Sequence, residues 1–293
     1  MFELWTRYEP IHAVTYFSPD AARAATDGGY RGFWMGYFAQ RAAPLGPVGP
    51  AVVTGCFFGF HPDRVARALP DAWSFAGPDR ALAARLDGVD RTLRRVWGAE
   101  LLGSAVVAEA AALLWAAAEA ADTAGRVLGA ANQALPRPES DHLAIWQASS
   151  TLREHRGDGH IAALIAHDVG PVEAMTLKIA AGVADGAGLR RARGWPDQAW
   201  SDAAAALTDR GWLDGVGRPT AAGRRGAADI ERCTEAAAAS PWVALGPART
   251  GRTRDLLDRL VAPILATDLI PVLNPIGLPR PGNATARSLP TGS

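Results

Sequence analysis

Cysteine and lysine are both scarce in this sequence. Its 293 residues include two cysteines, Cys56 and Cys233, and neither has a partner at the spacing of a metal site. Two such thiols in apolar or helical surroundings are typical of a protein kept in a reducing compartment, so we expect a cytoplasmic protein. Lys178 is the single lysine among 30 basic residues, and 30 acidic residues bring the net charge to zero. Because nucleic-acid-binding domains usually carry excess positive charge, any basic surface here must be a local patch.

Targeting and cofactor-binding patterns are also absent from the sequence. The N-terminus lacks the basic and apolar regions of a signal peptide. The alanine-rich run at residues 105–118 includes Glu109 and is too short to cross a bilayer. The sequence contains no G-x-G-x-x-G, no phosphate-binding P-loop and no metal-hydrolase helix motif. We therefore expect no membrane partner, no cofactor and no metal.

Alanine is abundant, and proline and glycine interrupt it at intervals that favour helices. Pro171 and Pro196 each begin a predicted helix, and a glycine turn at residues 214–217 separates two short extended pieces. Three helices followed by two extended pieces across a turn is the order of a winged helix-turn-helix.

A weak internal repeat indicates a second unit of this kind. The tripeptide G-P-V at residues 46–48 recurs at 170–172, and H-P-D at 61–63 recurs as W-P-D at 195–197. We predict a mainly α fold of tandem winged-helix-like units, with a small β-wing and one long connecting helix at residues 101–133. The predicted parts are an N-terminal helical, degenerate winged-helix-like unit (1–100), connecting helices (101–156), a winged helix-turn-helix unit (157–246), a C-terminal helix (247–275) and a disordered tail (276–293).

Aromatic side chains follow a helical spacing between residues 30 and 43. Tyr30, Phe33, Trp34, Tyr37 and Phe38 fall at i, i+3, i+4, i+7 and i+8, so they share one helix face. Such a stripe either packs against a core or lines a ligand site. The ten tryptophans, with their large amphipathic rings, would suit an apolar pocket for a planar ligand. The ligand-lining candidates from this argument are Trp34, Tyr37, Trp115 and Trp146.

The densest group of chemically active side chains lies at residues 152–160, L-R-E-H-R-G-D-G-H, here called the acid–base motif. Glu154 and Asp158 could act as general bases, and His155 and His160 could transfer protons near neutral pH. Arg153 and Arg156 could hold an anionic group, and the glycines would let the backbone turn sharply. The alternative is a charged turn between units, whose arginine–carboxylate pairs lock them together. His155, Asp158 and His160 do not match a known metal-ligand spacing.

A second polar group precedes this motif near the N-terminus. Glu9 and His12 are spaced to share one helix face, and Tyr16 lies one turn further on. We include these three residues among the ligand-binding candidates, although a histidine near aromatic residues is more often part of a core.

Residues 210–225, R-G-W-L-D-G-V-G-R-P-T-A-A-G-R-R, resemble the end of the recognition helix, the wing and the following helix of MarR-type winged-helix proteins. The wider pattern is similar to an actinobacterial helix-turn-helix family with MarR-like, winged-helix character. The segments that carry this resemblance are Y-E-P-I-H-A-V-T-Y-F (8–17), Y-R-G-F-W-M-G-Y-F (30–38), the acid–base motif and the R-G-W-L region. The family label describes a structure, so the resemblance implies a fold more firmly than an activity.

The helix that would read DNA has the wrong charge for that role. Residues 196–209 contain Asp197, Asp202 and Asp209 and no lysine or arginine, and Gln198 is the one side chain suited to base edges. Phosphate contacts remain open to arginines outside this helix. These DNA-binding candidates are Arg190, Arg191 and Arg193 before the helix, Gln198 on it, and Arg218 on the wing.

Our first functional prediction is a protein that binds a mostly apolar or polycyclic small molecule in a tryptophan-rich pocket between its two units. The acid–base motif would orient the ligand, and the sequence leaves open whether it also performs acid–base chemistry. The alternative is a ligand-responsive, dimeric DNA-binding regulator of MarR type, with DNA disfavoured as a partner by the acidic helix. A structural interaction module is a third alternative.

Overall fold

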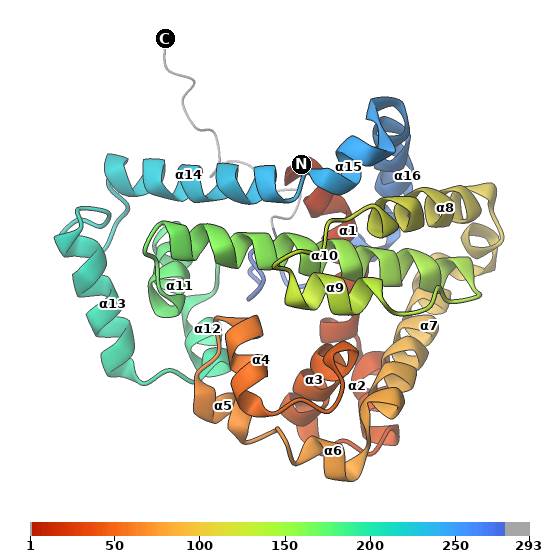
Figure 1. Ribbon diagram of the computed structural model, residues 1–293, viewed down its shortest axis with the longest axis horizontal. Coiled ribbons are helices and arrows are strands. Elements are labelled where there is room, and N and C mark those ends of the chain that lie inside the picture. Colours follow the sequence, from red (N-terminus) through yellow and green to blue (C-terminus); the bar gives the residue numbers. More distant parts are fainter. Residues whose placement is uncertain (1, 279–293) are drawn as a thin grey trace.

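A computed structural model describes residues 2–278 and shows a mainly helical protein, with no strand in that range (Figure 1). The N-terminal helices are α1 (Phe2–Phe17), α2 (Pro19–Asp27), α3 (Gly32–Ala42), η1 (Ala43–Leu45), α4 (Pro50–Phe57), α5 (Pro62–Ala66), α6 (Ala72–Phe75) and α7 (Pro78–Leu102). The middle of the chain forms α8 (Ala105–Glu119), α9 (Val127–Gln133) and α10 (Asp141–Ala166). The remaining helices are α11 (Pro171–Ala180), α12 (Gly186–Arg193), α13 (Asp197–Asp209), α14 (Ala221–Ala237), α15 (Ser240–Leu245) and α16 (Pro247–Leu265).

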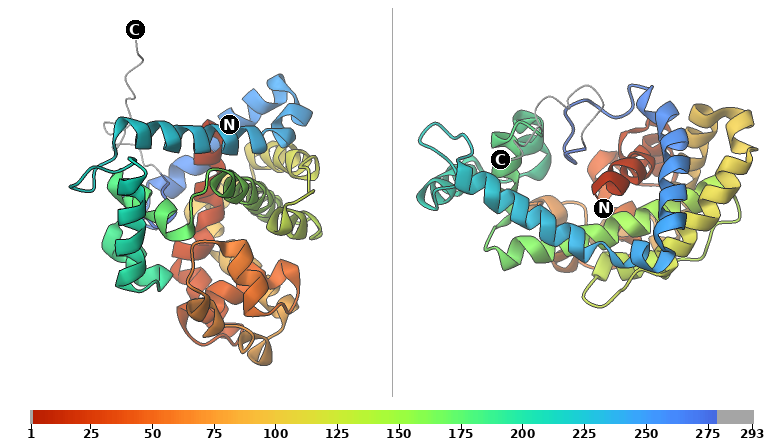
Figure 2. Two further views of the ribbon diagram at one scale, coloured as in Figure 1. Left: turned by 60° about the vertical axis from the view of Figure 1, so that its left-hand side comes forward. Right: turned by 90° about the horizontal axis from the view of Figure 1, so that it is seen from above.

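Helix α10 is the central element of the molecule. It contacts α1, α7, α8, α9 and α14, so that it is covered on most sides (Figures 1 and 2). Ile145, Trp146 and Leu152 are buried in the largest hydrophobic core, together with side chains of α1, α7, α8, α15 and α16. Because so many elements pack on α10, its polar residues are buried as well as its apolar ones, and each needs a partner.

Helix α2 begins at a capping serine and then crosses α7 at close range. Ser18 caps α2 by accepting a hydrogen bond from the Asp20 backbone N–H, and Pro19 follows at the first helical position. Where α2 crosses α7, a Cβ on Gly88 would lie 2.6 Å from the Cα of Ala21. This close crossing sets the short distance between α7 and α2.

Helices α11, α12 and α13 follow one another in the predicted helix-turn-helix order. Asp185 caps α12 through the backbone N–H groups of Ala187 and Gly188. Trp200 and Leu207 of α13 are buried against neighbouring helices. The predicted β-wing does not form strands; one antiparallel bridge between Leu213 and Pro219 closes that loop. Helix α14 then runs back along α10 towards α15 (Figures 1 and 2).

Two expectations about the middle of the chain are wrong. The predicted long helix at residues 101–133 is two helices, because the chain breaks at Gly103 and again before α9, where Gly125 has a φ of 72°. The acid–base motif is not a turn or a junction; it lies inside α10. Its Gly159 serves packing, because a Cβ there would lie 2.9 Å from the Cβ of Ala237 on α14.

The structure describes the predicted N-terminal unit and only the first residues of the predicted tail. Residues 2–100 contain no strand, so the tandem winged-helix arrangement stays a prediction. Of the predicted disordered tail, residues 276–278 are ordered, with Leu278 buried, and residues 279–293 lie outside the described range. No single helix in residues 2–278 is long and apolar enough to cross a membrane, although the sharply bent pair of α7 and α8 meets that test when combined.

Candidate functional site

A cavity of about 140 Å³ opens beside α3, and we call it the α3 pocket. Five other helices contribute to its walls. The lining residues are His12, Thr15 and Tyr16 of α1, Ala21, Ala22, Ala25 and Thr26 of α2, Gly32, Phe33, Gly36, Tyr37, Gln40 and Arg41 of α3, Arg85 of α7, Asn132 of α9, and Trp146 and Glu154 of α10. An apolar protein cavity of roughly 150 Å³ can hold benzene, so the space suits one small ring.

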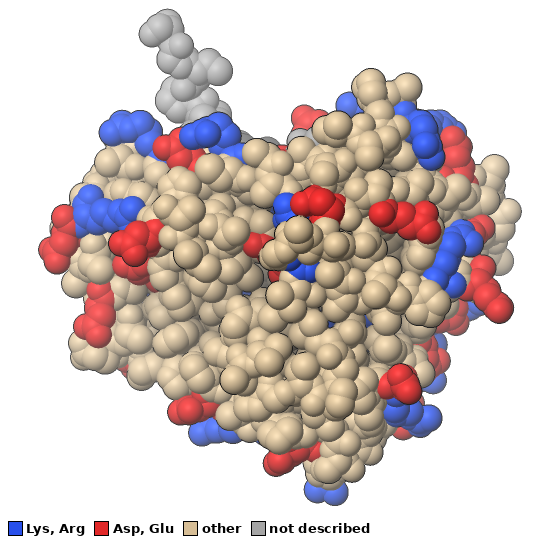
Figure 3. All heavy atoms as spheres, viewed as in Figure 1, with Lys and Arg blue, Asp and Glu red and all other residues tan. Residues whose placement is uncertain are grey.

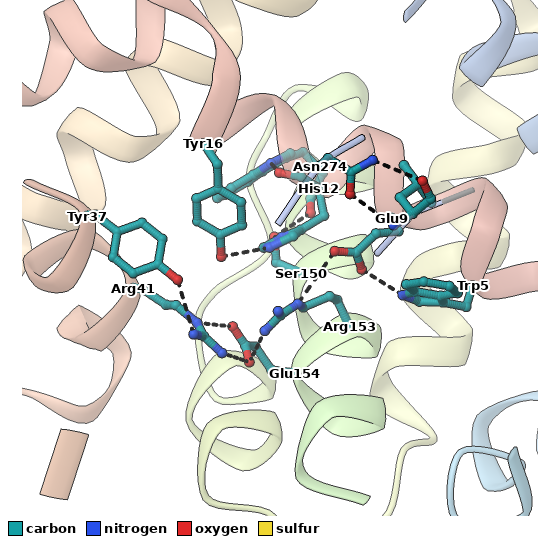
Figure 4. Close-up of polar contacts among 12 residues, drawn as sticks. Trp5, Glu9, His12, Tyr16, Tyr37, Arg41, Ser150, Arg153, Glu154 and Asn274 are labelled. Atoms are coloured by element: carbon teal, nitrogen blue, oxygen red, sulfur yellow. Dashed lines mark hydrogen bonds and ion pairs between the residues drawn. The ribbon is translucent and has the colours of Figure 1, made fainter. Parts of the chain in front are cut away.

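Glu154 is the centre of a buried ion-pair network at the inner wall. Arg41 donates two hydrogen bonds to its carboxylate at 2.9 and 3.0 Å, and Arg153 donates a third at 2.8 Å (Figure 4). Burial alone would raise the pKa of Glu154, but the charges of Arg153 and Arg41 lower it well below its ordinary value. Glu154 is therefore ionised and fully engaged by its two partners.

His12, Tyr16 and Ser150 form a second polar chain along the pocket. Ser150 donates to the Trp146 carbonyl at 2.9 Å, so its oxygen can accept from His12 Nδ1 at 2.8 Å. The Tyr16 hydroxyl, 2.9 Å from His12 Nε2, then acts as the donor to that nitrogen (Figure 4). Burial and the charge of Arg153 lower the pKa of His12 well below its ordinary value. The imidazole is neutral, and each polar side-chain atom of His12, Tyr16 and Ser150 has a hydrogen-bond partner.

Glu9 lies behind the pocket wall. It accepts a hydrogen bond from Trp5 Nε1 at 2.9 Å and lies 3.6 Å from Arg153 Nε. Burial raises the pKa of Glu9, although Arg153 and the Trp5 hydrogen bond act in the opposite direction. Glu9 thus supports Arg153 rather than facing a ligand.

Arg85 differs from Arg41 and Arg153, which pair with Glu154. It is 6% exposed and donates to the Gln40 carbonyl at 3.3 Å and to Gln147 Oε1 at 3.1 Å. Its guanidinium also lies 5.0 Å from the centre of the Trp146 ring. Within residues 2–278 it forms no ion pair with a carboxylate. Burial lowers the pKa of Arg85 to about 10, a value at which it is still charged near pH 7.

Three of the seven buried side-chain polar atoms without a hydrogen-bond partner in the described residues belong to the lining of the α3 pocket. Gln40 Nε2, Arg85 Nε and Asn132 Oδ1 are buried and have no hydrogen-bond partner within the described part of the chain. Each belongs to a residue that lines the pocket. A buried polar group without a partner costs on the order of 1–3 kcal/mol, so three together call for an explanation.

The structure divides the predicted site residues into two groups. His12, Tyr16, Tyr37, Trp146 and Glu154 line the α3 pocket, and Glu9 and Arg153 lie directly behind it.

The rest of the acid–base motif points elsewhere. His155 Nε2 lies 2.9 Å from Asp122, Asp158 accepts from the Gly129 backbone N–H at 2.9 Å, and His160 Nδ1 lies 2.9 Å from Thr234 Oγ1. Arg156 pairs with Glu231 and Glu235 of α14. Consecutive residues of a helix point about 100° apart, so nine residues inside α10 face all of its neighbours in turn. The motif is one sequence cluster but not one site.

Two of the predicted ligand-lining tryptophans also lie outside the pocket. Trp34 packs in the core of α3, α4 and α5 beneath the guanidinium of Arg64. Trp115 donates to Glu119 on the same helix at 2.8 Å. The walls are therefore richer in tyrosine than in tryptophan.

Sequence reasoning missed Gln40, Arg41, Arg85 and Asn132. A signal existed for two of them. Arg41 continues the aromatic stripe one turn beyond Tyr37, and Arg85 lies on the buried face of α7, four residues from both Ala81 and Val89. A charged residue within an apolar stripe indicates a buried charge that needs a partner. Asn132 gave no such signal, because it reaches the pocket only through the packing of α9 on α10.

The surface of the predicted DNA-reading helix is acidic, as the sequence indicated. Asp197, Gln198, Asp202 and Asp209 of α13 are exposed, and Gln198 donates to Asp202 at 2.8 Å. The face seen in Figure 3 shows acidic and basic side chains interspersed.

The candidate arginines around α13 differ in their exposure. Arg190, Arg191 and Arg218 are exposed and form no ion pair within the described residues. Arg193 instead turns inward, with its guanidinium 4.1 Å from the centre of the Phe60 ring. Three of the four predicted phosphate contacts are thus available.

Comparison with protein families now gives one match. Residues 1–271 match the model of a helix-turn-helix family. The chain belongs to this helix-turn-helix family. Searches among curated proteins and among solved structures gave no match. Helix-turn-helix membership agrees with the order of α11, α12 and α13, and it says nothing about a ligand.

Proposed function

We propose that this helix-turn-helix protein binds a small organic molecule in the α3 pocket. The observation that carries the proposal is the group of unpaired, buried polar atoms on Gln40, Arg85 and Asn132 around one cavity. A bound molecule with complementary polar groups would satisfy them, whereas an empty site leaves their desolvation uncompensated. The pocket volume supports a ligand of one ring rather than the polycyclic ligand expected from the tryptophan content.

The arrangement favours binding over acid–base chemistry by residues 152–160. His155, Asp158 and His160 contact α9, α14 or the loop before α9 rather than the pocket. Glu154 faces the pocket, but two arginines hold it in its ionised form. We therefore assign to Glu154 and Arg41 the role of shaping a rigid polar wall.

A panel of single-ring compounds tests this function. Binding is measured as an increase of the unfolding temperature and as a change in tryptophan fluorescence. The variant Ala22→Trp places a large ring at an exposed position of the pocket wall and should abolish binding. The matched control is Ala83→Trp, at an exposed position of α7 that does not line the pocket. Equal binding by both variants would place the ligand elsewhere.

A second candidate function is a MarR-like, ligand-responsive regulator that binds DNA as a homodimer. The family match supports this candidate, together with the three exposed and unpaired arginines Arg190, Arg191 and Arg218. The acidic face of α13 opposes it, because carboxylates repel phosphate and can accept hydrogen bonds only from the amino groups of cytosine and adenine in the major groove. These side chains favour contacts with the phosphate backbone of DNA and few contacts with base edges.

A further inference from the structure

We infer that the α3 pocket takes an organic anion with a single negative charge, a carboxylate on a ring-sized body, and that Arg85 is its counter-charge. This inference rests on the proposed function and names the chemical class of the ligand.

Among the residues that line the α3 pocket, one cation has no carboxylate partner. Glu154 is the one carboxylate among the described residues of the pocket wall, and it is already shared between Arg41 and Arg153. His12 is neutral, and Glu9 lies behind Arg153. Arg85 therefore lacks a negative partner within the described residues. A buried charge is costly unless it is paired, so a missing anion is the simplest account of a charged Arg85 at this position.

The hydrogen-bond donors point to the same class of ligand. A guanidinium has five N–H groups, and Arg85 uses one from each terminal nitrogen, to the Gln40 carbonyl and to Gln147. Three donors remain, including the buried Nε. The amide nitrogen of Gln40 is a fourth unpaired donor in the same wall. A carboxylate accepts bidentate hydrogen bonds from a guanidinium and still has capacity for an amide donor.

The size and charge of the pocket separate a carboxylate from larger anions. A phosphate ester carries a charge of about −1.5 to −2 near pH 7, which exceeds the one uncompensated positive charge of Arg85. The aromatic side chains Tyr16, Tyr37 and Trp146 favour an apolar body, and about 140 Å³ leaves room for one ring. Aromatic or alicyclic monocarboxylates match both conditions, and they satisfy the donors of Arg85 and Gln40 but not the acceptor Asn132 Oδ1, which needs a donor elsewhere on the ligand.

The test compares benzoate with benzamide, which has nearly the same shape and no charge. Affinities are measured by isothermal titration with the full-length protein. Wild type should bind benzoate about tenfold or more tightly than benzamide, since charge-assisted hydrogen bonds are roughly twice as strong as neutral ones, and tenfold corresponds to about 1.4 kcal/mol. Arg85→Gln should bind the two probes equally. Arg94→Gln, at an exposed position of the same helix, should keep the wild-type preference.

The outcomes separate the two proposals. Equal affinity of wild type for benzoate and benzamide would overturn the anion inference and leave the pocket function standing. If neither probe binds, and no other charged or neutral single-ring compound binds either, that result would contradict the proposed function itself. If Arg85→Gln does not fold, Arg85→Lys replaces it. This variant keeps the charge but loses the planar fork, so it should bind benzoate more weakly than wild type and still prefer it to benzamide.

Discussion

At the scale of single residues, Glu154 is the buried carboxylate at the centre of the ion-pair network in the pocket wall. Its carboxylate compensates Arg41 and Arg153 together, and its side chain is 3% exposed. The variant Glu154→Gln leaves the buried Arg41 guanidinium without a negative partner and leaves Arg153 with only the Glu9 carboxylate at 3.6 Å. It should therefore lower the free energy of unfolding by about 3–5 kcal/mol. Urea denaturation measures this loss.

The control for this prediction is an exposed pair of the same type. Glu109 and Arg252 form an ion pair on the surface, with side chains 42% and 52% exposed. Glu109→Gln should leave the denaturation midpoint nearly unchanged, because water screens such pairs. An equally small effect of Glu154→Gln would mean that the network does not stabilise the fold.

The buried histidines predict how stability depends on pH. Burial, with the charges of Lys178 and Arg156, lowers the pKa of His160 to about 3, and the pKa of an unfolded histidine is about 6.5. Between these values the unfolded chain binds a proton that the folded chain does not. The free energy of unfolding should therefore fall as the pH drops below about 6.5, by roughly 2 kcal/mol at pH 5 for this residue.

Comparing wild type with His160→Gln isolates this contribution. Asp158 acts in the opposite direction, because burial raises its pKa to about 6, but it is present in both proteins. The difference in unfolding free energy between the two proteins should shrink between pH 7 and pH 5. A difference independent of pH would show that His160 titrates normally in the folded protein.

At the scale of helices and loops, two glycines of α10 have opposite roles. A Cβ on Gly159 would lie 2.9 Å from both the Cβ of Ala237 and Nη1 of Arg126. A Cβ on Gly157 would have its nearest neighbour at 3.8 Å. Gly159→Ala should lower the melting temperature by separating α14 from α10, at a cost of about 1–3 kcal/mol.

Gly157→Ala is the matched control for this prediction. It should raise the melting temperature, because alanine favours a helix by about 1 kcal/mol over glycine. Thermal denaturation of the two variants side by side decides the point. The same sign for both would mean that the α10–α14 contact is not as tight as the structure indicates.

Several elements could be predicted from the sequence, for identifiable reasons. The 3.6-residue spacing of the aromatic stripe correctly predicted α3, and the proline starts and glycine turn correctly predicted the order of α11, α12 and α13. The sequence failed at α10, where two glycines in an acid–base cluster indicated a turn. Both glycines are inside a helix because long-range packing on α14 and α9 outweighs their local preference, and no local pattern reports such packing.

At the scale of the whole molecule, the candidate site could be predicted only in part. His12, Tyr16, Tyr37, Trp146 and Glu154 were named from their chemistry, and they do meet at one pocket. Arg85 and Asn132 were not named, because they reach the pocket from α7 and α9 only when six helices have packed together. The pocket lies among α1, α2, α3, α7, α9 and α10, and not between the two predicted units.

DNA binding is also a property of the whole molecule, and the second candidate function predicts its form. Duplex DNA should bind at low salt, and the affinity should fall as salt increases. Arg218→Ala should reduce the slope of that dependence by about one phosphate contact, and should weaken all sequences alike. Electrophoretic mobility shifts across a salt series measure both effects. Arg94→Ala on α7 is the control, and the absence of duplex binding at low salt would exclude this candidate.

The most direct test of the central claim is a crystal structure of the protein with benzoate at saturating concentration. The inference that the α3 pocket takes a ring-sized carboxylate predicts density for one benzoate inside the pocket, with its carboxylate at the guanidinium of Arg85. An α3 pocket without benzoate density at that concentration, or benzoate bound only at another site, would contradict the claim that this cavity takes a carboxylate at Arg85.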